Sequence, residues 1–155
     1  MKNKQNGKFY ALKFITPKDK REVKLFKNEI ALMMECNDTD YVLQCHEAYW
    51  FNNKIWIILE LMDGGSVAQM VEDMNGTYSE SFCKYVLYKV VRALKHLHAQ
   101  NILHRDVKSD NVLFSSDGEV KLADFGYACK LTKQLNHKSK VGTLCWMAPE
   151  MIKGK

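Results

Sequence analysis

The stretch His104-Arg105-Asp106-Val107-Lys108-Ser109-Asp110-Asn111, followed after a short hairpin by Asp124-Phe125-Gly126, decides how the rest of the chain is organised. It brings Asp106, Asn111 and Asp124 close together in the sequence. Carboxylate and amide oxygens suit Mg²⁺, and a carboxylate can also accept a hydroxyl proton. A polar loop before a hairpin would explain any one of these residues, but not all of them in this order. The stretch therefore predicts a site for phosphoryl transfer.

Near the N-terminus, the pattern predicts a strand at residues 9–15 that contains Lys13, and then a helix at residues 19–35. Helical spacing places Glu29 within an apolar stripe made of Leu25, Phe26, Leu32 and Met33. A buried carboxylate without a partner is unfavourable, so we expect a cation beside Glu29, and Lys13 is the candidate. The alternative is a helix rotated so that Glu29 faces water.

The remaining elements are shorter, except for one long helix. Strands are expected at 45–51, 54–61, 112–114 and 120–122, and a helix at 67–74 is expected to be capped by Ser66. The long helix begins after Ser79 and carries apolar residues at spacings of three and four, namely Phe82, Val86, Val90, Ala93, Leu94 and Leu97. It is therefore predicted to be a core helix.

These motifs resemble those of protein kinases of the serine/threonine type. The match consists of the catalytic loop 104–111, the metal loop 124–126, the lysine strand Tyr10-Ala11-Leu12-Lys13 and the segment Ala148-Pro149-Glu150. Gly142-Thr143 and Trp146-Met147 look most like the sterile-twenty group and its PAK-type members. Leu144-Cys145 and Leu59 depart from that group, which usually has Pro-Tyr and Met at these places, and this leaves the subfamily open.

The resemblance implies an α+β fold of the two-lobed protein-kinase type, incomplete at both ends. Residues 1–62 would form part of the N-terminal lobe, and residues 63–155 part of the C-terminal lobe, with the irregular segment 60–66 as the hinge. No G-x-G-x-x-G loop precedes Lys13, and the chain ends five residues after Glu150. We therefore expect this chain by itself to have little or no activity.

The resemblance also implies a role for each site residue. The catalytic group would be Asp106 as the base, Lys108 at the γ-phosphate, Thr143 as a partner of both, and the ion pair of Lys13 with Glu29. ATP would contact Lys13, Ala11, Glu60, Met62 and Leu113, with Leu59 as the gatekeeper, and Mg²⁺ would be held by Asn111 and Asp124. Ser139 would be an activating phosphosite paired with Arg105. Phe125 would pack against His104 and Met33, and Gly126 would let the backbone reverse.

Composition narrows the alternatives. The formal net charge of +5 is spread along the chain without a basic run, so we expect no nucleic-acid partner. The five cysteines are widely spaced and predict neither a zinc site nor a disulfide framework. The first residues contain no apolar signal segment, and the longest strongly apolar run, Ile55–Leu59, is too short to span a membrane. A cytoplasmic or nuclear location is expected.

The leading hypothesis is a serine/threonine protein kinase fragment that uses ATP and Mg²⁺ to phosphorylate protein hydroxyls. An upstream kinase or a small-GTPase-linked regulator would act through regions outside this chain. One alternative is a non-catalytic, kinase-like scaffold module. Another is a small-molecule phosphotransferase, which Gly142-Thr143 and the segment 148–150 disfavour because they resemble a peptide-docking segment.

Overall fold

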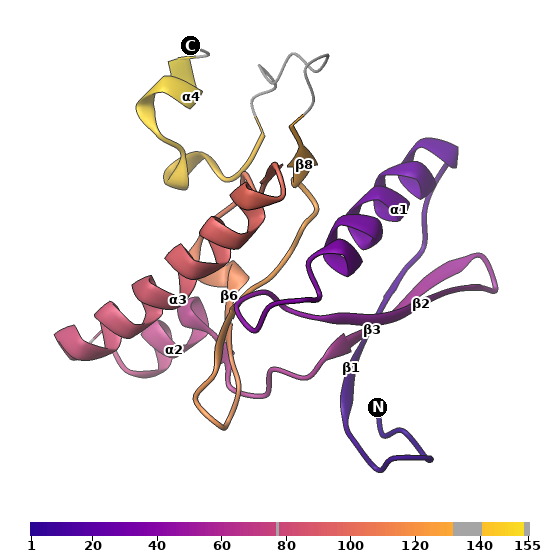
Figure 1. Ribbon diagram of the computed structural model, residues 1–155, viewed down its shortest axis with the longest axis horizontal. Coiled ribbons are helices and arrows are strands. Elements are labelled where there is room, and N and C mark those ends of the chain that lie inside the picture. The colour runs from indigo at the N-terminus through magenta and orange to yellow at the C-terminus, as the bar shows by residue number, and fades with distance from the viewer. Residues whose placement is uncertain (77, 132–140, 154–155) are drawn as a thin grey trace.

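The computed structural model describes residues 1–76, 78–131 and 141–153, and it begins with an antiparallel sheet covered by one helix (Figure 1). The sheet has the order β1-β3-β2, and its strands are β1 (Tyr10–Ile15), β2 (Cys45–Phe51) and β3 (Lys54–Glu60). Helix α1 (Lys20–Glu35) packs against β2. The turn between β2 and β3 places Asn52 at φ 49° and Asn53 at φ 56°, the left-handed pair that a tight hairpin needs.

The second part of the chain is mostly helical and carries two small sheets (Figure 1). Its helices are α2 (Val67–Asp73), α3 (Glu80–Ala99) and α4 (Pro149–Lys153), with short 3₁₀ helices η1 (Ser109–Asn111) and η2 (Leu144–Trp146). One sheet has the order β4-β6-β7, from β4 (Gly65–Ser66), β6 (Val112–Phe114) and β7 (Val120–Leu122), and the other pairs β5 (Ile102–Leu103) with β8 (Cys129–Lys130). The expected α+β class is confirmed.

Polar side chains fix where the helices begin. The Asp19 carboxylate accepts hydrogen bonds from the backbone N–H groups of Arg21 and Glu22, at 2.7 and 2.9 Å, so α1 starts one residue later than predicted. The Ser66 and Ser79 hydroxyls accept from backbone N–H groups in the first turns of α2 and α3. Such caps satisfy donors that a helix start leaves unpaired.

A continuous buried cluster joins the two parts, and β7 lies where they meet. The Leu122 carbonyl accepts a hydrogen bond from Leu43 N–H, and Leu122 N–H donates to the Tyr41 carbonyl, both at 2.9 Å. Leu122 is 1% exposed, and Phe125, which follows β7, is also 1% exposed. These two hydrogen bonds hold the loop before β2 against the segment that leads to Asp124.

Three sequence expectations need correction. Leu25 is 66% exposed, because α1 turns only one narrow face to the sheet, so it does not belong to the stripe around Glu29. Along α3 only Ala93 and Leu97 are fully buried, and the other expected core positions are partly buried. Gly126 does not carry the backbone reversal, since the left-handed residue of this loop is Asp124, at φ 65°.

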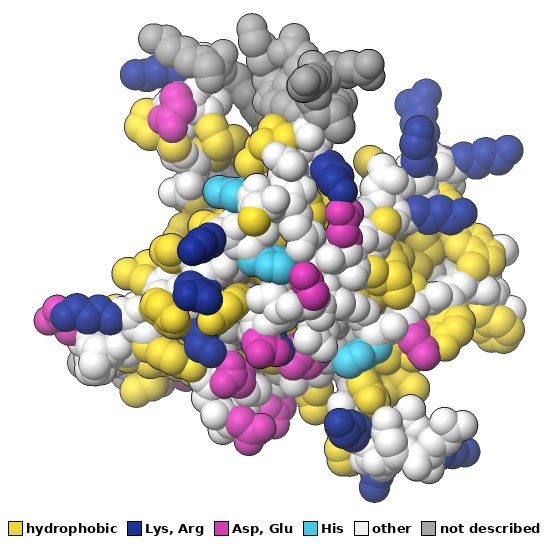
Figure 2. All heavy atoms as spheres, in the orientation of Figure 1, with side chains coloured by type: hydrophobic (Ala, Val, Ile, Leu, Met, Phe, Trp, Pro, Cys, Tyr) yellow, Lys and Arg dark blue, Asp and Glu magenta, His cyan; other side chains and the backbone are white. Residues whose placement is uncertain are grey.

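Surface features complete the description. All five cysteines are free thiols, and Cys36 is buried in a setting that raises its pKa to about 11, mainly through loss of hydration. On the face shown in Figure 2, Lys and Arg side chains are scattered over several elements with carboxylates among them. No helix in the described ranges combines the length and the apolar character needed to cross a membrane.

Candidate active site

A cavity of about 220 Å³ lies between the first sheet and the loops of the second part. Its upper wall comes from β1, α1 and β3, and its floor from η1, β6 and the residues after β7. Its lining is Lys13, Glu29, Met33, Leu43, Ile57, Leu59, Asp110, Asn111, Leu113, Ala123 and Asp124. The lining thus combines apolar and charged side chains, as a ligand with an apolar ring and an anionic group would need.

The upper wall contains the expected ion pair. Lys13 Nζ lies 3.5 Å from a carboxylate oxygen of Glu29, whose side chain is only 8% exposed. The Lys13 side chain is 47% exposed, so its ammonium group retains donors for a further partner. Burial raises the pKa of Glu29, because loss of hydration outweighs the attraction of Lys13. The expected ion pair is therefore present, although its N–O distance of 3.5 Å is long.

The residues beneath this floor, around Asp106, make more hydrogen bonds than the Lys13–Glu29 pair does. One Asp106 oxygen accepts hydrogen bonds from the backbone N–H and the hydroxyl of Thr143, at 2.8 and 2.7 Å. The other accepts from the Asn111 amide at 3.1 Å and lies 3.2 Å from Lys108 Nζ. Lys108 also donates to the Thr143 hydroxyl at 3.0 Å, so the contacts expected for Thr143 are present.

Hydrogen bonding lowers the pKa of Asp106. Burial alone would raise the pKa of this carboxyl, but the hydrogen bonds from Thr143 and Lys108 outweigh it, and the net pKa lies below the ordinary value. The Asp106 carboxylate in turn raises the pKa of Lys108. Asp106 is therefore ionised and Lys108 protonated near neutral pH.

Two oxygen-bearing side chains on the cavity floor could hold a cation. The Asn111 amide nitrogen is bonded to Asp106, at its carbonyl (2.8 Å) and its carboxylate, so the Asn111 oxygen is the atom left to ligate. Asp124 lines the same cavity. Within the described ranges no cluster of three or more His, Cys, Asp or Glu suits a metal ion. Mg²⁺ usually takes one or two protein oxygens and completes its shell with water and phosphate, so Asn111 and Asp124 could together serve as its protein ligands.

His104 supports the floor rather than the chemistry. It is 1% exposed, its ring nitrogen Nε2 lies 3.0 Å from the Ala123 carbonyl, and burial lowers its pKa. Its ring meets Phe125 edge-on at 5.4 Å, and Phe125 and Met33 belong to the same buried cluster. The contact expected between Phe125 and His104 is therefore found.

Asp106 lines a second cavity, of about 210 Å³, rather than the first. Its other lining residues are Arg105, Val107, Thr143, Trp146, Met147, Ala148 and Met151. Arg105 has a left-handed backbone, at φ 66°, and its Nε donates to the Tyr127 carbonyl at 2.7 Å. Ser139, expected to pair with Arg105, lies outside the described residues.

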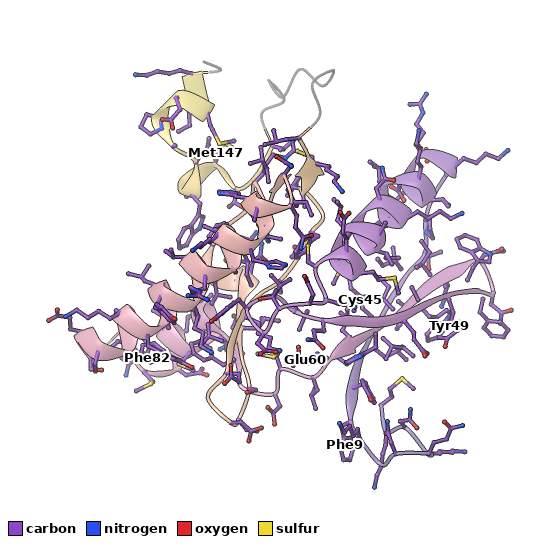
Figure 3. The ribbon with its side chains drawn as sticks, in the orientation of Figure 1. Phe9, Cys45, Tyr49, Glu60, Phe82 and Met147 are labelled. Carbon is purple, nitrogen blue, oxygen red and sulfur yellow. The ribbon has the colours of Figure 1, made fainter. Side chains whose placement is uncertain are left out.

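Three residues expected at the nucleotide do not line the first cavity: Ala11, Glu60 and Met62. The Glu60 side chain instead accepts two hydrogen bonds from Lys121, and Figure 3 shows Glu60 where the chain leaves the first sheet. Sequence reasoning missed Lys121. The sequence contained a signal for it, because a lone charged residue in the apolar strand 120–122 needs a buried partner, as Glu29 does.

Comparison with known proteins adds an independent finding. The whole chain, residues 1–155, matches the protein kinase domain family. The chain is similar to serine/threonine-protein kinase pakB of Dictyostelium discoideum, at 40% identity over 144 residues that cover 90% of this chain and 16% of the relative. It is 36% identical to serine/threonine-protein kinase 10 of Danio rerio over 151 residues, covering 97% of this chain and 15% of the relative.

A third relative is serine/threonine-protein kinase PAK 5 of Rattus norvegicus, at 35% identity over 150 residues that cover 96% of this chain and 20% of the relative. These relatives are thus of the sterile-twenty and PAK type that the motifs resembled. The chain spans between 15% and 20% of the length of the three relatives.

Proposed function

Because this chain belongs to the protein kinase domain family, we propose that it forms the nucleotide and acceptor sites of a serine/threonine protein kinase. The reaction is transfer of the γ-phosphoryl group of Mg-ATP to a protein hydroxyl. The observation that carries the proposal is the ionised Asp106, held by Thr143 and Lys108 beside a cavity that contains Lys13, Asn111 and Asp124.

The nucleotide would occupy the first cavity. Leu59, Leu113 and Ala123 offer apolar contact for a base, and Lys13 offers an ammonium group for phosphate oxygens. The backbone N–H of Met62 has no hydrogen-bond partner in the described part of the chain, so it can donate to the ring edge. We assign Ala11, Glu60 and Met62 to the rim of the base site, although none lines the cavity itself.

Asn111 and Asp124 would hold the magnesium ion. When bound, Mg²⁺ neutralises phosphate charge and orients the phosphates. The donor set fits this ion, because both residues line the cavity and carry hard oxygens.

Asp106 would orient the acceptor hydroxyl and take its proton late in the reaction, since a loose transition state needs little deprotonation. Its lowered pKa keeps it an acceptor at neutral pH. Lys108, bonded to Asp106 and Thr143, would offset charge that develops on the transferred group. The second cavity would hold the polypeptide that carries the hydroxyl.

The wider context is also part of the proposal. The lobe boundary would lie between residues 62 and 63, and the protein would be cytoplasmic or nuclear. A phosphate on Ser139 would pair with Arg105, and an upstream kinase or a small-GTPase-linked regulator would control that state. A Ser139→Ala variant that keeps full, regulated activity would contradict this part of the proposal.

Two measurements test the proposed function on a completed kinase domain, in which the missing N- and C-terminal parts are added to this chain. Calorimetry gives the affinity for ATP with and without Mg²⁺, and labelled ATP reports transfer to serine and threonine peptides. We expect Mg²⁺ to strengthen ATP binding and labelled phosphate to appear on the peptides. Asp124→Asn should abolish the magnesium effect, whereas the surface variant Asp117→Asn should preserve it. Binding without transfer would favour the non-catalytic scaffold, and no ATP binding would overturn both readings.

A further inference from the structure

Lys121 makes an unusual contact for a lysine. It lies in the middle of β7 and is 5% exposed, between Val120 and Leu122, which are fully buried. Its ammonium group lies 2.6 and 2.8 Å from the two carboxylate oxygens of Glu60, at the end of β3. Burying an ammonium group is costly unless it is well paired. A lysine at this position therefore needs an explanation beyond solubility.

The Lys121–Glu60 ion pair holds the segment that follows Leu59, the proposed gatekeeper, on the side opposite the first cavity. Glu60 N–H donates to the Gln44 carbonyl at 3.0 Å, and Gln44 N–H donates back to a Glu60 carboxylate oxygen at 3.4 Å. With Lys121, the side chain and the backbone of Glu60 are both fixed on the face away from the first cavity. The next residues lead to Met62, the proposed donor to the base.

The metal side of the site is held by a different contact. The chain continues from β7 through Ala123, whose backbone N–H donates to the Asn111 carbonyl at 2.8 Å, and into Asp124. Asn111 and Asp124 are the proposed magnesium ligands. Because this hydrogen bond is made by the backbone, it does not depend on the Lys121 side chain.

We propose that Lys121 is a positioning residue for the nucleotide. Through Glu60 it fixes the backbone of residues 60–62 against β7 and so sets the affinity for the adenine ring. This inference rests on the proposed nucleotide site, but it makes a separate claim about which part of the ligand depends on the pair. Loss of the Lys121–Glu60 pair should weaken the binding of adenosine but leave the binding of a bare polyphosphate unchanged.

The test measures binding of adenosine and of magnesium tripolyphosphate to Lys121→Met by calorimetry. Methionine fills similar volume, and Glu60, which is 28% exposed, can then turn to water. We expect the adenosine dissociation constant to rise at least about fivefold, while tripolyphosphate affinity stays within twofold. Lys121→Arg should retain adenosine binding, because it can still pair with both carboxylate oxygens.

The matched control is Lys89→Met, which breaks the Lys89–Glu119 pair (2.7 Å) one residue before β7. It should lower thermal stability without changing adenosine affinity. If Lys121→Met fails to fold, Glu60→Gln tests the same pair from its other side.

The inference is overturned if the tested variant of the pair binds adenosine as wild type does, or loses both ligands equally. It is also overturned if Lys89→Met weakens adenosine to the same extent. A wild-type protein that binds neither ligand refutes the nucleotide site itself, and the positioning role with it.

Discussion

Two buried carboxylates, Glu29 above the first cavity and Asp106 below it, respond to burial in opposite ways. The side chain of Glu29 is 8% exposed and that of Asp106 is 2% exposed, so both have lost most of their hydration. The pKa of Glu29 is raised, and the pKa of Asp106 is lowered. Glu29 has one lysine at 3.5 Å, whereas Asp106 accepts two hydrogen bonds from Thr143 and others from Asn111 and Lys108.

The direction of each pKa shift thus follows the number of donors around the carboxylate, since burial acts in the same sense on both groups. Asp106 is held by several donors, which suits its proposed role as proton acceptor. Glu29 has a single contact, at 3.5 Å, which leaves the Lys13 ammonium group donors for the proposed contact with phosphate. The following substitutions test this contrast.

The largest effect is expected for Asp106→Asn, which keeps the shape of the side chain but cannot accept the hydroxyl proton. Phosphoryl transfer to a peptide should fall by about 10²- to 10⁴-fold. Affinity for the nucleotide should hardly change, because Asp106 does not line the first cavity. Transfer assays and calorimetry measure the two quantities. Equal losses in binding and in transfer would contradict the role given to Asp106.

Thr143→Val should show how much the floor depends on donors. The change removes the hydroxyl that bonds Asp106 and Lys108, and the free energy of unfolding should fall by about 1.5–3 kcal/mol at neutral pH. Since the folded pKa of Asp106 lies below its ordinary 3.8, this stabilisation is present above that value and is lost as the pH falls through the folded pKa.

Urea unfolding at pH 7 and below pH 3.8 measures the free energy of unfolding of wild type and of Thr143→Val. The difference between the two proteins should become smaller in acid. An exposed threonine, Thr16, provides the matched control, since Thr16→Val removes a hydroxyl without such partners. A difference that does not depend on pH would mean that Thr143 acts by packing alone.

Gly142→Ala tests how Thr143 reaches the floor. Gly142 has φ 117°, and an added Cβ would lie 2.5 Å from the Arg105 carbonyl oxygen. We expect about 1–3 kcal/mol of destabilisation, with the hydrogen bonds of Thr143 to Asp106 weakened. Gly118→Ala, where a Cβ would meet no neighbour, isolates the backbone cost at positive φ. Thermal unfolding of both variants measures it, and equal losses would show that the close approach to Arg105 is unimportant.

The smallest effect is expected for Glu29→Gln. Because Lys13 is half exposed, the pair contributes no more than about 1 kcal/mol at neutral pH. The raised pKa of Glu29 means that the folded state binds its proton more readily, so wild-type stability falls as the pH rises through that pKa. Relative to Glu29→Gln, wild type should gain stability in mild acid. Unfolding curves over this range check the direction, and a loss in acid would refute it.

Much of this arrangement could be predicted from the sequence because it rests on local patterns. Helical spacing identified Glu29 as a buried charge, and the structure supplies its expected partner. Cap residues marked the starts of α2 and α3. The contacts of Thr143 with Asp106 span 37 residues, and only the family resemblance suggested them.

The errors have physical causes as well. Leu25 was assigned to the core because periodicity gives the direction of a side chain but not the width of the buried face. The backbone reversal in this loop was expected at Gly126, because glycine adopts the left-handed conformation most easily, but Asp124 is the residue that adopts it. The partner of Lys121 was missed because Glu60 lies 61 positions away in the sequence. Pairing over that distance depends on tertiary structure, which local patterns do not contain.

The left-handed backbones of Arg105 and Asp124 have a consequence for protein engineering. A side chain in this conformation costs about 1–2 kcal/mol, which glycine would avoid. A screen for thermostability alone would therefore favour glycine at both positions, and it would remove a proposed magnesium ligand and a proposed phosphate partner. Variants selected in this way should have higher thermal stability but lower activity. Any library built on this chain should therefore keep Arg105 and Asp124 unchanged.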